Sequence, residues 1–321
     1  MHIFDSLIGS LLSPMVLAFA LGILATLIKS DLKFPDGLYA ALTIYLLFAI
    51  GLKGGYKLSQ TPIKEFILPA LFGLLLGVMI PIWMFFILKK FGKFDYTNAA
   101  AIAAHYGSVS AVTFGEGIAF LDLMKIPYEG YMPTLLAVME IPGIIVALLI
   151  ARKYSKSESS MGRIFHELFT NKGTVLLIGG LVIGFVSGNK GHEQIAPLFE
   201  TLFRGMLTLF LLEIGLVTGR KLADLKKVGS FLVAFGIVMP IVNAVIGILC
   251  GKLAGLGVGG CTMLGVLASS ASYIAAPAAV RIALPEANPT YYLTSALAIT
   301  FPFNVTIGLP LYFSIANFIV G

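Results

Sequence analysis

The stretch IGLKGGYKL at residues 50–58 returns half a chain later as IGLVTGRKL at residues 214–222, with six of the nine positions identical. Each stretch ends a long apolar segment. A second pair of signals recurs with the same internal spacing: Ser108, Ser110 and Pro127 in the first half, and Ser270, Ser272 and Pro289 in the second. The sequence therefore predicts an internal repeat, which in a membrane protein is typical of transporters that open alternately to the two sides.

The composition predicts a membrane protein. Hydrophobic residues make up 58% of the 321 residues and charged residues only 12%, whereas about 25% are charged in soluble proteins. The long continuous apolar runs exclude a β-barrel, whose strands alternate, and predict an all-α polytopic membrane protein. The net charge of +6 does not indicate nucleic-acid binding, because the basic residues fall in short loops between apolar segments, where they set topology.

The chain divides into ten apolar segments and one sizeable polar stretch. That stretch, residues 153–172, contains KYSKSESS and lies between two sets of five segments. We expect it to link a first five-helix repeat, residues 1–152, to a second, residues 173–321. Because five is odd, the second repeat is inverted relative to the first. The ten segments are roughly 8–28, 37–56, 66–88, 97–123, 129–151, 173–188, 198–219, 228–253, 259–283 and 291–318.

The distribution of basic residues predicts the orientation in the membrane. If the N-terminus lies outside, the loops on the inner side carry most of the Lys and Arg residues, as the positive-inside rule requires. We therefore expect a multi-pass protein of the plasma membrane with both termini outside and residues 153–172 in the cytoplasm. The main inner clusters are Lys89, Lys90 and Lys93; Arg152, Lys153, Lys156, Arg163 and Lys172; and Arg220, Lys221, Lys226 and Lys227.

Two polar interruptions occupy corresponding places in the two halves, AAHYGSVSAVTFGEG at residues 103–117 and LASSASYIAAPAAVR at residues 267–281. A membrane helix that unwinds exposes N–H and C=O groups, which in hydrocarbon need water, substrate or ions as partners. Half-helices that start near Ser110 and Ser272 present free N–H groups and a positive dipole end to an anion. Pro277, one turn past the second break, fits a helix restart. The alternative is that each serine hydrogen-bonds back to its own helix.

Three carboxylates lie within apolar segments: Glu116, Glu140 and Glu213. A carboxylate inside the membrane is typically a cation ligand or a proton carrier, and the alternative for each is a structural carboxylate satisfied by its neighbours. His105 lies one turn before Ser108, a spacing that also fits the base–nucleophile pair of an intramembrane hydrolase. No third orienting group or oxyanion motif accompanies that pair, so a packed histidine is the simpler interpretation.

A series of motifs carries a resemblance to a known family. In chain order they are IGLKGGYKL at 50–58, GSVS at 107–110 with Thr113, KIPYE at 125–129, EIP at 140–142, LFRG at 202–205, and SSASYIAAP followed by ANP within 268–289. In this order they resemble the sodium-dependent bicarbonate transporter family, over essentially the whole chain.

The resemblance implies a gate domain and a core domain built from two inverted repeats, with two interrupted helices that cross in the core. It also implies a homotrimer, an elevator-type movement of core against gate, and bicarbonate between the half-helix N-termini with Na⁺ nearby. A small PII-like protein docks on the cytoplasmic face of some members, although the linker here lacks their long insertion. Tyr273 stands where the family has an Asp that helps to hold sodium, and Val112 where it has a small polar residue.

The sequence as a whole predicts a secondary active transporter of a small monovalent anion, bicarbonate by resemblance, driven by sodium, and not an enzyme. The alternatives are a sodium- or proton-coupled carrier of another small anion or organic acid, an intramembrane hydrolase, and a transport-inactive sensor. The anion is expected at the amides and hydroxyls of Gly107, Ser108, Ser110, Thr113, Ser269, Ser270, Ser272, Tyr273 and Ala275. The cation is expected at Glu140 or Glu116, which replace the family Asp, with Ser110 and Ser272.

Overall fold

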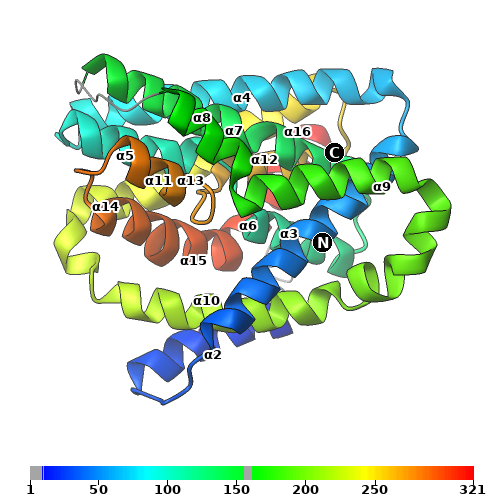
Figure 1. Ribbon diagram of the computed structural model, residues 1–321, viewed down its shortest axis with the longest axis horizontal. Helices are drawn as coiled ribbons and strands as arrows, with labels where there is room; N and C mark the ends of the chain where they lie inside the picture. Colours follow the sequence, from blue (N-terminus) through cyan, green and yellow to red (C-terminus); the bar gives the residue numbers. More distant parts are fainter. Residues whose placement is uncertain (1–8, 10, 155–160) are drawn as a thin grey trace.

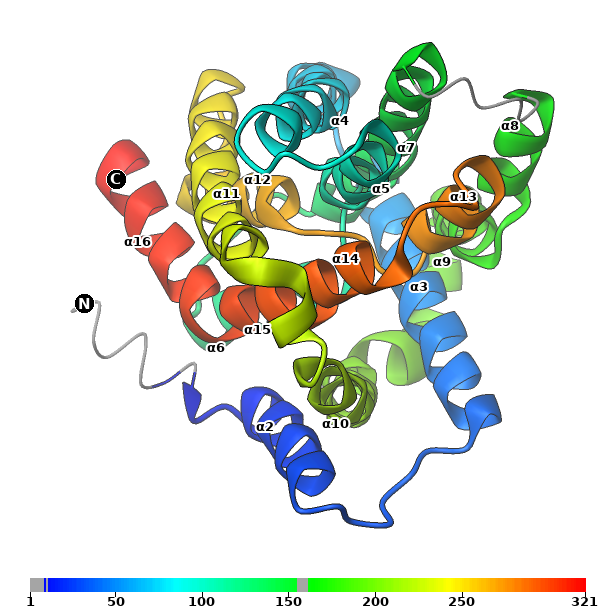
Figure 2. The same ribbon diagram turned by 90° about the vertical axis from the view of Figure 1, so that its left-hand side faces the viewer.

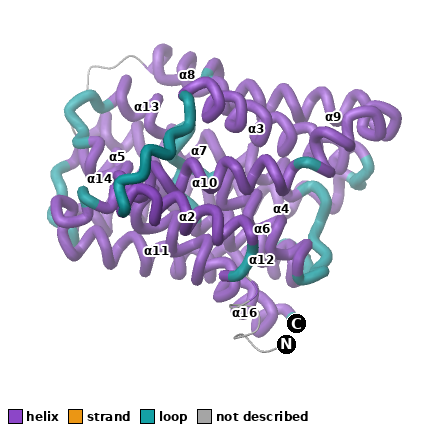
Figure 3. Tube along the Cα trace, turned by 90° about the horizontal axis from the view of Figure 1, so that it is seen from below, coloured by secondary structure: helices purple, strands orange, loops and turns teal. Residues whose placement is uncertain are grey.

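The computed structural model describes residue 9 and residues 11–154 and 161–321. Within these ranges all regular structure is helical, and the loops are short compared with the long helices that they connect (Figures 1 and 3). The helices of the first half are α2 (Pro14–Leu27), α3 (Asp36–Ser59), α4 (Ile63–Lys90), α5 (Tyr96–Gly107), α6 (Ala111–Leu123) and α7 (Met132–Tyr154). Those that follow are α8 (Met161–Thr170), α9 (Lys172–Ala196), α10 (Phe203–Leu222), α11 (Leu225–Leu253), α12 (Val258–Ser269), α13 (Ala276–Ala283), α14 (Pro289–Thr294), α15 (Phe301–Phe303) and α16 (Leu309–Val320).

The described residues contain six helices that are long and apolar enough to cross a membrane. Each of the ten predicted segments overlaps one or more helices of the structure. Fewer than ten of these helices are long enough to cross a membrane, because some segments are short or interrupted. The prediction of an all-helical, multi-pass membrane protein is therefore confirmed. The six spans are Asp36–Ser59, Ile63–Lys90, Met132–Tyr154, Lys172–Leu222, Leu225–Leu253 and Pro289–Val320, and α2 and α12 are shorter apolar helices.

Helix α3 packs along α9 through glycines from both helices. A Cβ atom on Gly51 of α3 would lie 2.5 Å from the carbonyl oxygen of Leu177, and one on Gly184 of α9 would lie 2.1 Å from the carbonyl oxygen of Leu52. Only glycine allows two helix backbones to approach this closely. The first copy of the repeated motif thus supplies the contact surface between α3 and a helix from the other half of the chain.

Helix α10, which carries the second copy of the motif, packs in the same way on α2. A Cβ atom on Gly215 would lie 2.2 Å from the carbonyl oxygen of Phe19, and one on Gly22 would lie 2.2 Å from that of Leu212. In Figure 2, α2 lies beside α10. Because α3 also contacts α10, the helices α2, α3, α9 and α10 form one unit, which we call the four-helix layer.

The remaining long helices form two groups behind this layer. Helices α4, α5 and α7 pack on one another, and so do α11, α12 and α16 (Figure 2). The last of these belongs to a segment that starts at α14 and passes through two π-helical turns, Ser295–Thr300 and Asn304–Gly308. We call α4–α7 and α11–α16 together the crossed bundle, because two interrupted helices meet inside it.

Two glycines with positive φ mark the points where long helices change direction. Gly188 in α9 has φ 58° and Gly229 in α11 has φ 79°, conformations that other residues rarely adopt. Beyond Gly188 the chain curves round and α10 runs back along the molecule (Figure 1). The sixth predicted segment ends at residue 188, and the eighth begins at residue 228, so both kinks coincide with predicted segment ends.

The predicted linker, residues 153–172, contains a helix of its own. Within α8, Ile164 and Leu168 are buried, and the helix contacts α9 and α13. Residues 155–160, which hold the serine-rich part of the linker, lie outside the described residues. The polar stretch is thus partly an amphipathic helix packed on the rest of the protein.

Candidate functional site

Both predicted interruptions are breaks between two helices. The first leaves residues 108–110 between α5 and α6, and the second leaves residues 270–275 between α12 and α13. The helix after each break donates an N–H group of its first turn to a serine of the break: Ser110, the N-cap of α6, accepts from the N–H of Thr113 at 3.2 Å, and Ser272, three residues before Ala275 at the N-cap of α13, accepts from the N–H of Ala276 at 3.3 Å. The two serines therefore have similar roles, although the second break is longer.

The two breaks are hydrogen-bonded to each other. The N–H of Ser110 donates to Ser270 Oγ at 2.9 Å, and the N–H of Ser272 donates to the carbonyl oxygen of His105 at 2.7 Å. In each break, one backbone N–H that has lost its helical partner therefore finds an acceptor in the other interrupted helix. Buried backbone groups require such partners. Residues about 160 positions apart in the chain meet at this point.

Each break is also tied to a later helix of its own half. Ser108 Oγ donates to the carbonyl oxygen of Glu140 in α7 at 2.8 Å. Asn304, in the second π-helical turn, donates from Nδ2 to the carbonyl oxygen of Ser269 at 3.1 Å and accepts from the hydroxyl of Tyr312 at 2.7 Å. Asn304 is fully buried. It is absent from the site residues predicted from the sequence, although it is a polar residue in an otherwise apolar segment.

A small cavity of about 10 Å³ lies where the breaks meet, which is about the volume that one water molecule needs. The N–H groups of Ala111 and Val112, the first two residues of α6, have no acceptor among the described residues. Free amides at a helix N-terminus attract anions. The cavity is lined by Leu47, Val109, Ser110, Ala111, Glu140, Ser272, Tyr273 and Ile274.

The structure separates the predicted anion-binding residues into two sets. Ser110, Ser272 and Tyr273 line the cavity. The others are buried beside it in supporting roles. Ser108 and Ser270 bond as described above, and Ser270 Oγ also donates to the carbonyl oxygen of Leu267 at 2.9 Å, as Ser269 Oγ does to Val266. Gly107 packs on Pro81 and Gly143, Thr113 donates to the capping Ser110, and Ala275 precedes α13.

The three candidate carboxylates lie in three different places. Glu140 lines the cavity between the breaks. Glu116 is also buried, but it lines a separate cavity of about 10 Å³ with Ser13 and Leu309, and its Oε1 has no hydrogen-bond partner among the described residues. Glu213 lies 3.6 Å from the guanidinium of Arg220. No group of three His, Cys, Asp or Glu side chains in the described ranges could hold a metal ion, so a cation at the cavity must rely on neutral oxygens beside Glu140.

Tyr273 lines the cavity with a polar side chain. Its ring packs edge-on against Phe301, with centroids 5.6 Å apart. Its hydroxyl is buried and lies close to Ser110, without a hydrogen bond of ordinary geometry to any described residue. A buried hydroxyl without such a bond is costly.

The structure does not pair His105 with Ser108 as a hydrolase would. The Nδ1 atom of His105 lies 2.7 Å from the carbonyl oxygen of Ala101, and its ring stacks on Tyr292 with centroids 4.5 Å apart. The hydroxyl of Ser108 donates instead to the backbone carbonyl oxygen of Glu140. His105 is therefore a packed residue whose carbonyl group supports the second break.

Comparison with known families identifies the chain. Residues 14–317 match the family model described as the Na⁺-dependent bicarbonate transporter superfamily. The match includes both helix breaks, the two copies of the repeated motif and all the long helices. A comparison with curated proteins finds no match.

Proposed function

Because the chain belongs to the Na⁺-dependent bicarbonate transporter superfamily, we propose that it is a secondary active transporter that takes up bicarbonate together with sodium. The observation that carries this proposal is the meeting of two serine-containing helix breaks at one buried cavity. Such breaks in membrane helices are tolerated where they line a binding site.

The anion is held by the N-terminus of α6 and by the hydroxyls around it. The N–H groups of Ala111 and Val112 are free to donate to bicarbonate oxygens, and Ser110 and Ser272 line the same cavity. Backbone amides and the positive end of a helix dipole bind an anion without a fully charged side chain. The hydroxyls of Ser108, Ser269 and Ser270 support the breaks rather than bind the ion.

Sodium is held on the Glu140 side of the same cavity. Hard cations take oxygen ligands, and Glu140 is the one carboxylate that lines this cavity. The hydroxyls of Ser110, Ser272 and Tyr273 provide further oxygens, so Glu140 takes the place of the missing family Asp. Glu116 belongs to a different cavity and is the weaker candidate.

Transport follows from sliding the crossed bundle, as the core, against the four-helix layer, as the gate. A cavity that fits about one water is too small for a three-oxygen anion, so Leu47 of α3 must separate from the breaks before bicarbonate enters. Two inverted repeats explain why equivalent hydrogen bonds recur between layer and bundle: Thr134 Oγ1 to the carbonyl oxygen of Gly54 at 3.4 Å, and Thr218 Oγ1 to that of Leu297 at 3.0 Å.

The remaining features of the proposal concern the surroundings of the protein. We place both termini outside and residues 153–172 in the cytoplasm, on the distribution of basic residues. The family resemblance supports a homotrimer, and a PII-like regulator would meet the protein at the cytoplasmic linker.

Uptake of labelled bicarbonate into proteoliposomes, with and without an inward sodium gradient, tests the proposed function. Sodium-stimulated uptake is expected. If folded protein takes up no bicarbonate under either condition, the proposal is wrong, and competition among small carboxylates and other anions would then identify the cargo.

A further inference from the structure

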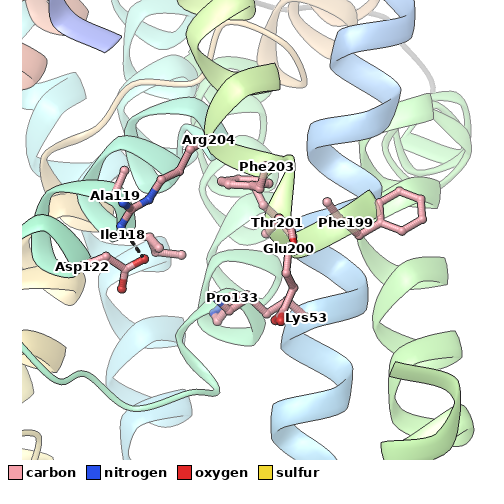
Figure 4. A pocket seen from close by; sticks show the side chains of 12 residues that line it. Lys53, Ile118, Ala119, Asp122, Pro133, Phe199, Glu200, Thr201, Phe203 and Arg204 are labelled. Carbon is pink, nitrogen blue, oxygen red and sulfur yellow. Dashed lines mark ion pairs between the residues drawn. The ribbon is translucent and has the colours of Figure 1, made fainter. Parts of the chain in front are cut away.

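A cavity near the site opens between the four-helix layer and the crossed bundle. Its volume is about 260 Å³. Figure 4 shows side chains from α3, α6 and α10 converging on it, with Arg204 reaching from α10 toward Asp122 on α6. We call this cavity the vestibule, and its polar side chains are Lys53, Asp122, Glu200, Thr201 and Arg204.

The vestibule continues toward the helix breaks. A second cavity of about 10 Å³ shares Ile50 with the vestibule, and it shares Leu47, Ala111 and Ile274 with the cavity at the breaks. Its lining is almost entirely apolar. The vestibule, an apolar neck and the proposed anion site therefore lie in series along the boundary between layer and bundle.

Among the described residues, one cation that lines the vestibule is not paired with a carboxylate. Arg204 forms an ion pair with Asp122 at 3.3 Å, whereas Glu200 lies 3.4 Å from Nε2 of His192, a contact that becomes an ion pair only when the histidine is protonated. The ammonium group of Lys53 forms no ion pair or hydrogen bond with any described residue. Lys53 lies one helical turn beyond Ile50, the residue that the vestibule shares with the neck, and on the side of Ile50 away from the breaks.

The repeated motif indicates that a lysine is not required at this position for helix packing. In IGLKGGYKL and IGLVTGRKL, the position of Lys53 is taken by Val217 in the second copy, whereas Lys57 corresponds to Lys221. Val217 packs against the hydrophobic core. Two equivalent helices thus differ at this position, and the difference adds a positive charge to the vestibule.

We propose that Lys53 forms an outer capture site, which binds the transported oxyanion in the vestibule before the anion passes the apolar neck. This inference rests on the proposed function, because it concerns the route to the same site. A half-buried lysine that forms no ion pair with a described residue attracts an anion more strongly than a surface lysine, since screening by water is weaker there. Such a site raises the local anion concentration without taking part in coupling.

Transport kinetics of Lys53→Met test the capture site. We expect KM for bicarbonate to rise about threefold to tenfold with little change in the maximal rate, because the charge acts on capture rather than on translocation. Raising the ionic strength should weaken uptake by the wild type and have little effect on the variant. Lys53→Arg keeps the charge and should restore KM.

Lys57→Met is the matched control. Lys57 lies one turn further along α3, its ammonium group is 5.1 Å from the ring centroid of Tyr56, and it does not line the vestibule. This variant should keep the wild-type KM and salt dependence. Equal KM values for Lys53→Met and the wild type, or equal changes in the two lysine variants, would overturn the proposal.

A measurement without transport separates this inference from the proposed function. A cysteine at Thr201, in protein lacking Cys250 and Cys261, can be modified in detergent by an anionic or a cationic methanethiosulfonate reagent. The ratio of anionic to cationic rates should fall about threefold in Lys53→Met and stay unchanged in Lys57→Met. If the wild type moves no bicarbonate but this ratio falls, only the proposed cargo is wrong; an unchanged ratio removes the capture site.

Discussion

At the residue scale, the serines of the two breaks divide by what their hydroxyls contact. Ser108, Ser269 and Ser270 donate to backbone carbonyls, whereas Ser110 and Ser272 accept from N–H groups at the start of the following helices and line the cavity. The first group holds the breaks in shape, and the second is available to a bound ion. Substitutions in the first group should therefore disturb the structure of the breaks, whereas substitutions in the second group should weaken ion binding.

Ser110→Ala and Ser272→Ala should each lower uptake by about tenfold while the protein still inserts and folds, because each removes a hydrogen bond to the ion of roughly 1.5 kcal/mol. The N-cap lost in Ser110→Ala should also cost about 1 kcal/mol of stability. Initial uptake rates at equal protein amounts are the measurement. Ser314→Ala, whose hydroxyl bonds to Pro310 in α16, is the control, and wild-type uptake by both Ser110→Ala and Ser272→Ala would remove the crossed-break site.

The placement of the carboxylates leads to a second prediction. Glu140→Gln should raise the sodium concentration for half-maximal uptake by about tenfold, since a neutral amide is a weaker cation ligand than a carboxylate. Glu116→Gln, in its separate cavity, should leave the sodium curve nearly unchanged. Sodium titrations of uptake decide between them, and the reverse result would move the coupling ion to Glu116.

At the scale of the element, the repeated motif acts through its glycines. They allow α3 to lie on α9 and α10 to lie on α2 with backbones in contact. In a membrane, helix association depends on such close packing, because lipid offers no hydrophobic driving force between helices. The four-helix layer is therefore held together by close backbone packing, which suits the gate role proposed for it.

Neighbouring glycines of α9 allow a matched test of this packing. A Cβ atom on Gly180 would lie 2.9 Å from the carbonyl oxygen of Phe48, whereas one on Gly179 would meet nothing within 4 Å. Gly180→Ala should destabilise the protein by about 1–3 kcal/mol, and Gly179→Ala should be neutral or stabilising by up to about 1 kcal/mol. Thermal unfolding in detergent measures both, and equal effects would contradict the packing argument.

At the scale of the whole molecule, the proposed transport route follows the boundary between the four-helix layer and the crossed bundle. The vestibule, the neck and the cavity at the breaks all lie on it. The ion pair between Arg204 of α10 and Asp122 of α6 spans the same boundary. If the bundle slides against the layer, this pair must break in each transport cycle.

Linking the two sides of the boundary should therefore stop transport. Cysteines at Asp122 and Arg204, in protein lacking Cys250 and Cys261, can be joined through two disulfides by a short bis-methanethiosulfonate reagent. Uptake should fall to background after cross-linking and return after reduction, whereas each single-cysteine protein should keep its uptake. Full activity in completely cross-linked protein would exclude a sliding movement at this boundary.

The sequence by itself determined the class of the protein, the position of its helices and the place of both breaks. Long apolar runs, the repeated glycine motif and the polar interruptions at residues 103–117 and 267–281 are local signals, and each is visible within one or two helical turns. Pro277 likewise marked the start of α13, where it occupies the first turn. Family membership followed from the order of such local motifs.

Only the tertiary structure decided which side chains face the site. These helices are apolar on most faces, so periodicity could not show that Ser110 and Ser272 face the cavity while Ser269 and Ser270 bond to their own helix. The partnership of Asn304 with the second break, the separation of Glu116 from Glu140 and the position of Lys53 in the vestibule were equally hidden. Each depends on contacts between helices far apart in sequence, and the rotation of each helix about its axis is set by its neighbours.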